Sequence, residues 1–151
     1  MIARGRAAAH ALYCSTAAAR HQFVQHTVRL LAERAPAIVA ANALDLQASR
    51  DLPPAVRDRL RLDLPRVEAI ARDAQQVARL PEVVGATVDR RTMPNGLVVE
   101  RQRVPIGLIG IIYEARPNVT IDAATLAVLA GNAVVLRGGS EARHSNQILA
   151  E

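Results

Sequence analysis

Residues 103–141 decide the fold of this chain, and their sequence is R-V-P-I-G-L-I-G-I-I-Y-E-A-R-P-N-V-T-I-D-A-A-T-L-A-V-L-A-G-N-A-V-V-L-R-G-G-S-E. Residues 106–113 are apolar and largely β-branched, which is typical of a strand buried on both faces. Residues 119–130 carry apolar side chains at helical spacing, and Gly131 then provides a helix stop. Residues 133–136 form a second apolar run. The stretch therefore predicts a βαβ unit with two parallel strands.

The second strand ends in Arg137, Gly138, Gly139, Ser140 and Glu141. Backbone N–H groups and a guanidinium are thus expected at the carboxyl edge of a parallel sheet, where phosphates bind. Ser140 and Glu141 could donate to or accept from ribose hydroxyls. They could equally form the N-cap and first turn of the next helix, and the two roles are compatible.

The turn after the first strand carries Glu114, Arg116 and Asn118 to the same edge. Asn118 could cap the following helix, or its amide could stabilise a developing oxyanion. The spacing alone favours the cap. Glu114 and Arg116 could bind a substrate weakly or pair with each other on the loop.

A standard dinucleotide-binding fingerprint is absent from this unit. The G-x-G-x-x-G motif belongs between the first strand and the helix, whereas Gly107 and Gly110 lie inside the strand. Any nucleotide must therefore bind the edge in a different way.

The composition is that of a globular protein: 151 residues, 50% hydrophobic and 22% charged. The net charge is +5, and all basic residues are arginines that are spread along the chain among acids. With two tyrosines and one phenylalanine there is little aromatic surface for base stacking, so small anionic ligands fit better than nucleic acid. An arginine-rich nucleic-acid binder remains a weaker alternative.

The cysteine count and the hydropathy of the chain indicate whether it binds a metal, spans a membrane or forms disulfides. Cys14 is the one cysteine, so no intramolecular disulfide forms, and it has no zinc-ligand neighbours. No segment is apolar enough to span a membrane. We therefore expect no metal site, no membrane contact and a cytoplasmic location. Residues 1–20 could be a transit peptide, but their helical pattern continues downstream and favours an ordinary helix.

The segment before residue 87 predicts helices. Residues 2–34 indicate one long amphipathic helix with Arg20 on its polar side. Residues 37–49 predict a second helix with Ile38, Ala41 and Leu44 facing inward. Further helical patterns cover residues 55–62, 65–80 and 142–151.

Residues 87–92 and 97–102 predict a β-ribbon. The Asn95-Gly96 pair between them is a strong hairpin signal. Such a ribbon covers a sheet or pairs with another subunit. The predicted organisation is a helical segment at 1–86, a ribbon at 87–104 and the start of an incomplete α/β domain at 105–151.

The runs V-P-I-G-L-I-G-I-I-Y-E-A-R-P-N-V-T and A-G-N-A-V-V-L-R-G-G-S-E-A resemble the γ-glutamyl phosphate reductases, also called glutamate-5-semialdehyde dehydrogenases. The segments at 40–46, 57–62 and 94–97 resemble that family as well, so the similarity runs from about residue 30 to the end. The resemblance implies an aldehyde-dehydrogenase-like fold, of which this chain is an N-terminal portion. In that fold the coenzyme binds the strand edge without a glycine-rich fingerprint.

The resemblance also implies a function. The family uses NADPH to reduce L-glutamyl 5-phosphate to L-glutamate 5-semialdehyde in proline synthesis, releasing phosphate. By motif, Arg137 lies near the adenosine ribose and its 2′-phosphate, residues 138–141 line the same edge, and Asn118 stabilises the oxyanion. The full-length enzyme is expected to form a homo-oligomer, with the ribbon resembling its oligomerisation strands and glutamate 5-kinase as its pathway partner.

The catalytic cysteine of the family and its catalytic domain lie beyond residue 151. Cys14 stands outside every motif, and we expect it to be a buried structural thiol rather than a nucleophile. The 151-residue chain alone is therefore expected to be inactive. A non-catalytic nucleotide- or anion-binding module is the alternative function.

Overall fold

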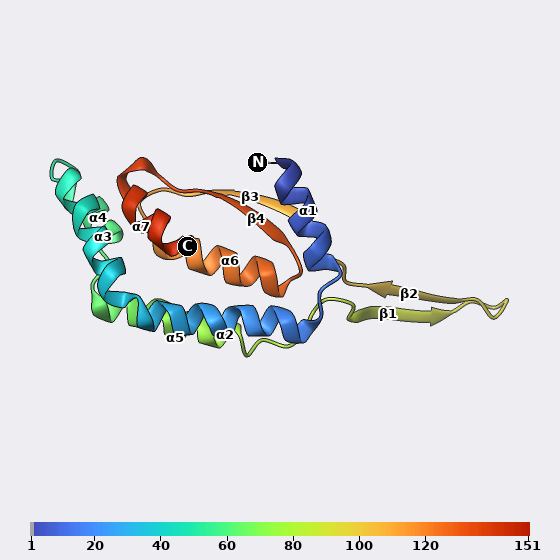
Figure 1. The fold of residues 1–151 in the computed structure, drawn as a ribbon. Coiled ribbons are helices and arrows are strands. Elements are labelled where there is room, and N and C mark those ends of the chain that lie inside the picture. The colour runs from blue at the N-terminus through green and yellow to red at the C-terminus, as the bar shows by residue number, and fades with distance from the viewer. Residues whose placement is uncertain (1) are drawn as a thin grey trace.

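The computed structural model describes residues 2–151 and shows an α/β chain with a two-stranded sheet, a layer of helices and a protruding ribbon (Figure 1). Met1, which belongs to the predicted segment 1–86, lies outside the described residues. In chain order the elements are α1 (Ile2–Tyr13), α2 (Ala17–Glu33), α3 (Ala35–Ala48), α4 (Pro54–Leu60), α5 (Leu64–Val77), β1 (Thr87–Thr92), β2 (Val98–Gln102), β3 (Leu108–Ile112), α6 (Asn118–Leu129), β4 (Ala133–Arg137), the 3-10 turn η1 (Ser140–Ala142) and α7 (Arg143–Leu149).

The predicted βαβ unit is present. Strands β3 and β4 pair in parallel from Leu108 opposite Ala133 to Ile112 opposite Arg137, and α6 is the crossover between them. Gly131 ends α6 with φ +72°, and a Cβ atom there would lie 2.7 Å from Pro105 Cγ. A glycine therefore suits both the turn and its close packing.

The prediction that β3 is buried on both faces is wrong for this chain. Ile112 is 80% exposed and Ile106 is 83% exposed. The sheet of the described residues has only two strands, and two strands with one crossover helix leave apolar surface uncovered.

The main core lies between α2, α3, α5 and α6 (Figure 1). Helix α5 contributes Val67, Ile70 and Ala74, as its apolar spacing predicts, and α6 contributes Ile121. Asp63 caps α5 by accepting a 3.0 Å hydrogen bond from the backbone N–H of Arg66. This core fixes α6, and with it the first turn of α6, against the N-terminal helices.

The single helix predicted for residues 2–34 is wrong, because the chain breaks between α1 and α2. Thr16 has extended φ and ψ and caps α2, its Oγ1 accepting from the N–H of Ala19 at 3.1 Å. The break places Arg20 in the interior, 4% exposed, where it donates to the Ser15 carbonyl at 2.7 Å and pairs with Glu82 at 2.8 Å. Arg20 therefore joins the helix start to the loop before the ribbon.

The inward face predicted for α3 is also wrong in part. Leu44 is 51% exposed and Ala41 is only half-buried. The buried residues of the helix instead follow a 3-4-3-4 spacing and include polar side chains: Ala35, Ile38, Asn42, Asp45 and the C-cap residue Ser49. Polar groups are buried here because α7 supplies their hydrogen-bond partners.

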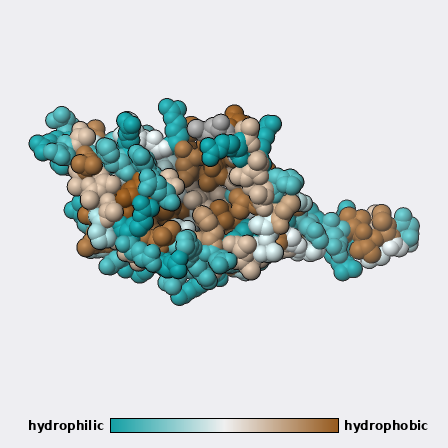
Figure 2. Space-filling model, viewed as in Figure 1, coloured by the Kyte–Doolittle hydropathy of each residue, from teal (hydrophilic) through white to brown (hydrophobic). Residues whose placement is uncertain are grey.

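The predicted hairpin is confirmed as β1 and β2, an antiparallel pair with Gly96 at φ +84° in its turn. The ribbon protrudes from the body and does not cover the sheet of this chain (Figure 1). Figure 2 shows apolar side chains gathered on its outer part. The exposed large apolar residues of the ribbon are Val88, Met93, Leu97, Val98 and Val99.

Candidate functional site

The carboxyl ends of β3 and β4 bring the candidate residues to one edge. Ile112 lies opposite Arg137 in the parallel register, and the N–H of Tyr113 donates to the Arg137 carbonyl at 3.1 Å. The turn at 113–118 and the turn at 138–141 therefore leave the sheet side by side. This juxtaposition is what the sequence predicts for a parallel βαβ unit.

Arg137 ends β4 with an exposed side chain. Within residues 2–151 its guanidinium makes no ion pair and no hydrogen bond, so all of its N–H donors are open to a ligand. A planar guanidinium left open at a strand edge is suited to bidentate binding of a phosphate.

Neighbouring side chains lie close to the two glycines that follow Arg137. A Cβ atom on Gly138 would collide with Nδ2 of Asn146 and lie 3.1 Å from Cε2 of Tyr113. A Cβ atom on Gly139 would collide with the carboxylate of Glu141, which folds back over it. The backbone of Gly138 and Gly139 is therefore covered by neighbouring side chains.

The prediction that Ser140 caps the next helix is wrong. Gly139 occupies the position before the 3-10 turn η1, and no side chain caps that turn. Glu141 does lie in its first turn, as predicted. The backbone enters a 3-10 turn before α7, so the cap geometry that Ser140 would need does not form.

Ser140 and Glu141 line an open cavity of about 670 Å³ between η1, α3 and α4. Its other polar wall residues include Asp51, Arg143 and His144. A volume of this size is in the range of small-ligand sites. Arg137 lies outside the wall of this cavity, so the edge presents an open guanidinium beside a polar hollow.

The prediction that Asn118 caps α6 is wrong. Pro117 occupies the N-cap position with helical φ −57° and ψ −30°, so Asn118 is already the first residue of the helix. The side chain of Asn118 instead donates from Nδ2 to Oδ2 of Asp122 at 2.9 Å. An amide nitrogen has two hydrogens, so one donor of Asn118 stays available at the edge.

Asp122 is the partner that the sequence analysis missed. Burial raises the pKa of Asp122 above its ordinary value; the Asn118 hydrogen bond lowers it, and the charge of Asp73 adds to the rise. The available signal was the spacing, because asparagine and aspartate four residues apart on a helix are neighbours.

Glu114 and Arg116 are both exposed and do not pair through their side chains in the described part of the chain. Only their backbones meet, where the N–H of Arg116 donates to the Glu114 carbonyl at 2.6 Å. The interpretation of these residues as an ion pair is therefore wrong. Both side chains extend from the turn that Asn118 follows.

A second missed cluster joins three elements at the edge. Tyr113 Oη lies 2.7 Å from Thr120 Oγ1, and Thr120 Oγ1 donates to Asn146 Oδ1 at 3.1 Å. Tyr113 directly follows β3, Thr120 lies in the first turn of α6 and Asn146 in the middle of α7. Sequence reasoning had no local signal for them, because they are far apart along the chain.

A third missed cluster holds α7 against α3. The Asp45 carboxylate, 2% exposed, accepts from the N–H of His144 at 3.0 Å and from the N–H and Oγ of Ser145 at 2.8 and 2.7 Å. Asn42 donates to Ser145 Oγ at 3.0 Å and to the Leu60 carbonyl at 2.8 Å. The turn that carries Ser140 and Glu141 is thereby anchored to the helical layer.

An apolar cavity of about 420 Å³ lies apart from these turns, between α2, α6 and α7. Phe23, Leu30, Ile121 and Ile148 are among its wall residues. In Figure 2 apolar side chains are seen in the hollow of the body. Polar residues also line it, but its one arginine, Arg34, is already paired with Glu151 at 3.0 Å.

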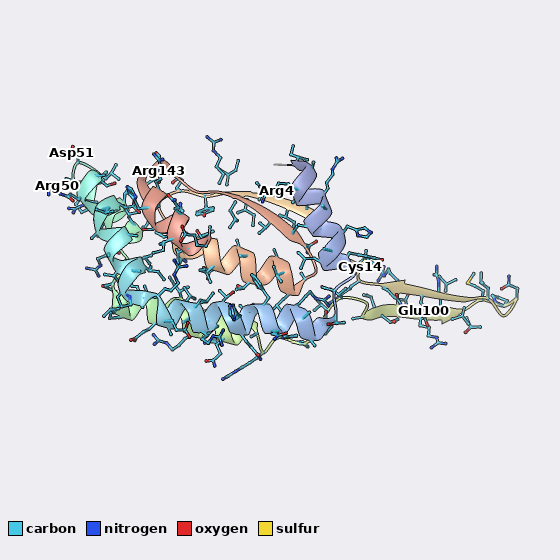
Figure 3. All side chains as sticks on the ribbon, viewed as in Figure 1. Arg4, Cys14, Arg50, Asp51, Glu100 and Arg143 are labelled. Carbon is cyan, nitrogen blue, oxygen red and sulfur yellow. The ribbon has the colours of Figure 1, made fainter. Side chains whose placement is uncertain are left out.

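Cys14 is exposed, which contradicts the expectation of a buried thiol. Figure 3 shows it beside the base of the ribbon, whereas Arg143, just after the second turn, lies at the other end of the sheet. Among residues 2–151, no group of three or more His, Cys, Asp or Glu could hold a metal ion. No helix in that range is both long and apolar enough to cross a membrane.

The sequence of this chain is similar to those of several γ-glutamyl phosphate reductases. No protein-family model matches the chain. It is 46% identical over 148 residues to a γ-glutamyl phosphate reductase of Dehalococcoides mccartyi, which covers 97% of this chain and 35% of the relative. A γ-glutamyl phosphate reductase of Sphingopyxis alaskensis is 60% identical over 111 residues, covering 72% of this chain and 26% of the relative. The chain spans about a third of the length of the first of these.

Solved structures agree with the sequence matches. The γ-glutamyl phosphate reductase of Thermotoga maritima superposes with a TM-score of 0.91 at 36% identity, covering 95% of this chain and 35% of that protein. The Saccharomyces cerevisiae enzyme of the same name gives 0.92 at 28% identity, covering 97% and 38%. A Bacillus subtilis protein assigned as an aldehyde dehydrogenase gives a TM-score of 0.63 at 18% identity, covering 97% of this chain and 30% of that protein, which shows the fold alone. The predicted aldehyde-dehydrogenase-like fold is confirmed.

Proposed function

Because this chain belongs to the γ-glutamyl phosphate reductase family, we propose that it forms part of an enzyme that reduces L-glutamyl 5-phosphate to L-glutamate 5-semialdehyde with release of phosphate. NADPH is the proposed reductant. The observation that carries the proposal is the open Arg137 at the carboxyl edge of β4, beside two tightly packed glycines. An enzyme of this kind needs an anion-binding edge on its coenzyme sheet, and the open guanidinium of Arg137 is suited to provide it.

The residues at the edge fit a dinucleotide carrying a 2′-phosphate. Arg137 would bind that phosphate through its planar guanidinium. Ser140 and Glu141 would bond ribose hydroxyls from the wall of the polar cavity. NADPH, once bound, supplies the hydride for the reduction.

Asn118 is proposed to stabilise the oxyanion of the reacting carbonyl. Its free amide hydrogen lies at the start of α6, where the helix dipole also favours negative charge. The bond to Asp122 holds the amide in one orientation, which preorganises the donor. Glu114 and Arg116 are proposed to contact the substrate from the same turn, with Arg116 suited to its phosphate.

The nucleophile of the proposed reaction is a cysteine thiolate outside this chain. The thiolate would attack the acyl carbon and phosphate would leave; hydride would then reduce the thioester to the aldehyde and release the thiolate. Cys14 is unsuited to this role because it lies at the other end of the sheet from the two turns (Figure 3). We therefore expect the isolated chain to turn over no acyl phosphate.

A non-catalytic nucleotide-binding module is the second candidate. Cys14 lies far from the carboxyl edge of the sheet, which favours this candidate, because binding needs only that edge whereas catalysis also needs a thiol there.

In the full-length enzyme we propose a homo-oligomer that pairs through the ribbon, and a pathway link to glutamate 5-kinase. The exposed apolar residues of β1 and β2 support the pairing.

NADPH fluorescence titration of the purified chain tests the coenzyme edge. We expect saturable binding that weakens about tenfold or more in Arg137→Ala, because a charge-assisted bidentate contact is lost. Arg91→Ala is the matched control, since it removes an exposed arginine on the distant ribbon. Equal affinity of both variants would contradict the site assignment. Reduction of an acyl phosphate by the chain alone would contradict the missing nucleophile.

A further inference from the structure

The hydrogen bonds of Tyr113, Thr120 and Asn146 have a fixed direction. Thr120 has one hydroxyl hydrogen and donates it to Asn146 Oδ1 at 3.1 Å. The contact of 2.7 Å between Tyr113 Oη and Thr120 Oγ1 must therefore be donated by the tyrosine. The chain of donors runs from β3 through the first turn of α6 to α7.

This direction fixes which end of the Asn146 amide faces the edge. With Oδ1 held by Thr120, the amino group Nδ2 lies against Gly138, where it would collide with any Cβ atom. Within the described residues Nδ2 has no hydrogen-bond acceptor, although its side chain is half-buried. Two N–H donors are thus presented beside the residue that follows Arg137.

We propose that Asn146 is a ligand-binding residue of the coenzyme edge, with Nδ2 donating to a phosphate or ribose oxygen of the dinucleotide, and that Tyr113 and Thr120 position it. The inference rests on the proposed coenzyme function of this edge. It adds to Arg137 a neutral donor from a different element, α7. The absence of a side chain on Gly138 leaves room for Nδ2 at this place.

Asn146→Asp is the direct test. Aspartate has the same shape, and its Oδ1 still accepts from Thr120, but the amino group becomes a carboxylate oxygen that cannot donate. We expect the Kd for NADPH to rise about tenfold or more, because a donor to a charged or polar oxygen is replaced by a repelling charge. Gln147→Glu is the matched control, since it adds the same charge at the adjacent exposed residue and should change Kd by less than about threefold.

Thr120 variants test the positioning role. Thr120→Val keeps the shape and removes the hydroxyl, so Asn146 loses its fixed orientation and Kd should rise about threefold to tenfold. Thr120→Ser restores the hydroxyl and should restore Kd to within about twofold of the unsubstituted chain. Urea midpoints of all variants are measured in parallel, because a purely structural role would change stability while leaving the affinity of the folded fraction unchanged.

The outcomes distinguish the proposed role of Asn146 from the proposed binding of NADPH at this edge. If the unsubstituted chain binds NADPH and Arg137→Ala weakens binding, but Asn146→Asp binds as tightly as Gln147→Glu, the assignment of Asn146 is overturned and the coenzyme edge stands. If the unsubstituted chain does not bind NADPH, the coenzyme edge and the role of Asn146 fall together. Weakened binding in Asn146→Asp and Thr120→Val, with recovery in Thr120→Ser, supports the inference.

Discussion

At the scale of single residues, Asn118 and Asp122 act as one unit at the start of α6. The Asn118 amide donates to the Asp122 carboxylate, so the candidate oxyanion donor is oriented by a half-buried acid. Burial raises the pKa of Asp122, and Asn118 and Asp73 act on it in opposite directions. The stability of the chain should therefore depend on the ionisation of this carboxyl.

Asp122→Asn tests this dependence. A raised pKa in the folded state stabilises the fold below the ordinary value of 3.8, and that contribution is lost as pH rises through the folded pKa. Asparagine cannot ionise and still accepts from Asn118. Urea unfolding at pH 4 and pH 7 should show a smaller stability loss toward neutral pH in the variant. An identical loss in both proteins would contradict the burial of this carboxyl.

The pKa of Glu82, the partner of Arg20, shifts in the opposite direction to that of Asp122. Burial raises the pKa of Glu82, but hydrogen bonds from Val84 and Arg20, with the charge of Arg20, outweigh it and lower the pKa overall. The contribution of this carboxylate to stability is present above its ordinary pKa of 4.5 and is lost as pH falls through the folded value.

Glu82→Ala should leave Arg20 buried without its acid. We expect the free energy of unfolding at pH 7 to fall by about 2 kcal/mol, below the cost of breaking a fully buried pair because Glu82 is partly exposed. Glu68→Ala, which breaks the exposed pair with Arg72, serves as the control and should cost less than about 0.5 kcal/mol. Equal losses in the two variants would contradict the buried role of Arg20.

At the scale of elements, the position of α7 depends on Asp45. Its carboxylate accepts three hydrogen bonds from the start of α7, and those bonds tie the turn at 138–142 to α3. Loss of the acceptor would leave buried N–H groups unsatisfied. The proposed coenzyme edge therefore relies on α3, a helix that contributes no candidate ligand-binding residue itself.

Asp45→Ala is expected to lower the free energy of unfolding by about 3 kcal/mol and to weaken NADPH binding by loosening the turn. Asp51→Ala removes an exposed carboxylate near the same cavity and should leave stability nearly unchanged. Circular dichroism during urea unfolding measures the first effect. A variant that unfolds at the same urea concentration as Asp51→Ala would show that α7 is held by other contacts.

The elements that the sequence predicts well are those specified locally. The Asn95-Gly96 turn and the Gly131 stop follow from backbone conformations that glycine adopts readily, and both are found. The break at Thr16 was missed because its cap lies inside an alanine-rich run that favours helix on either side. The buried face of α3 was missed because Asn42 and Asp45 gain partners only from residues about a hundred positions later.

The candidate site also has features that the sequence predicts and features that it does not. The register of a parallel sheet predicts that Arg137 and the Asn118 turn share an edge, and the structure brings them there. The contacts of Thr120 and Gly138 depend on Asn146 of α7, which is distant in sequence. The partner of Asn118 depends on where α6 begins. Cap positions were wrong at Asn118 and Ser140 because Pro117 and Gly139 occupy the preceding positions with their own backbone conformations.

At the scale of the whole molecule, the chain combines the proposed coenzyme edge, exposed sheet surface and a protruding ribbon. Ile106, Ile112 and Leu126 are large apolar residues that stay exposed around the βαβ unit. Apolar surface of this kind is usual where further chain or another subunit packs. The chain spans about a third of its relatives, and it contains the two turns that the proposed function assigns to coenzyme and oxyanion.

Mapping NADPH on the 15N-labelled chain by NMR tests the central claim most directly, because it reports which backbone amides sense the ligand. The account predicts shifts at saturating NADPH that concentrate in residues 113–118 and 137–146, with those of 137–146 reduced in Arg137→Ala. Shifts centred on the ribbon or on the apolar cavity between α2 and α6 would contradict it, as would no shifts at all.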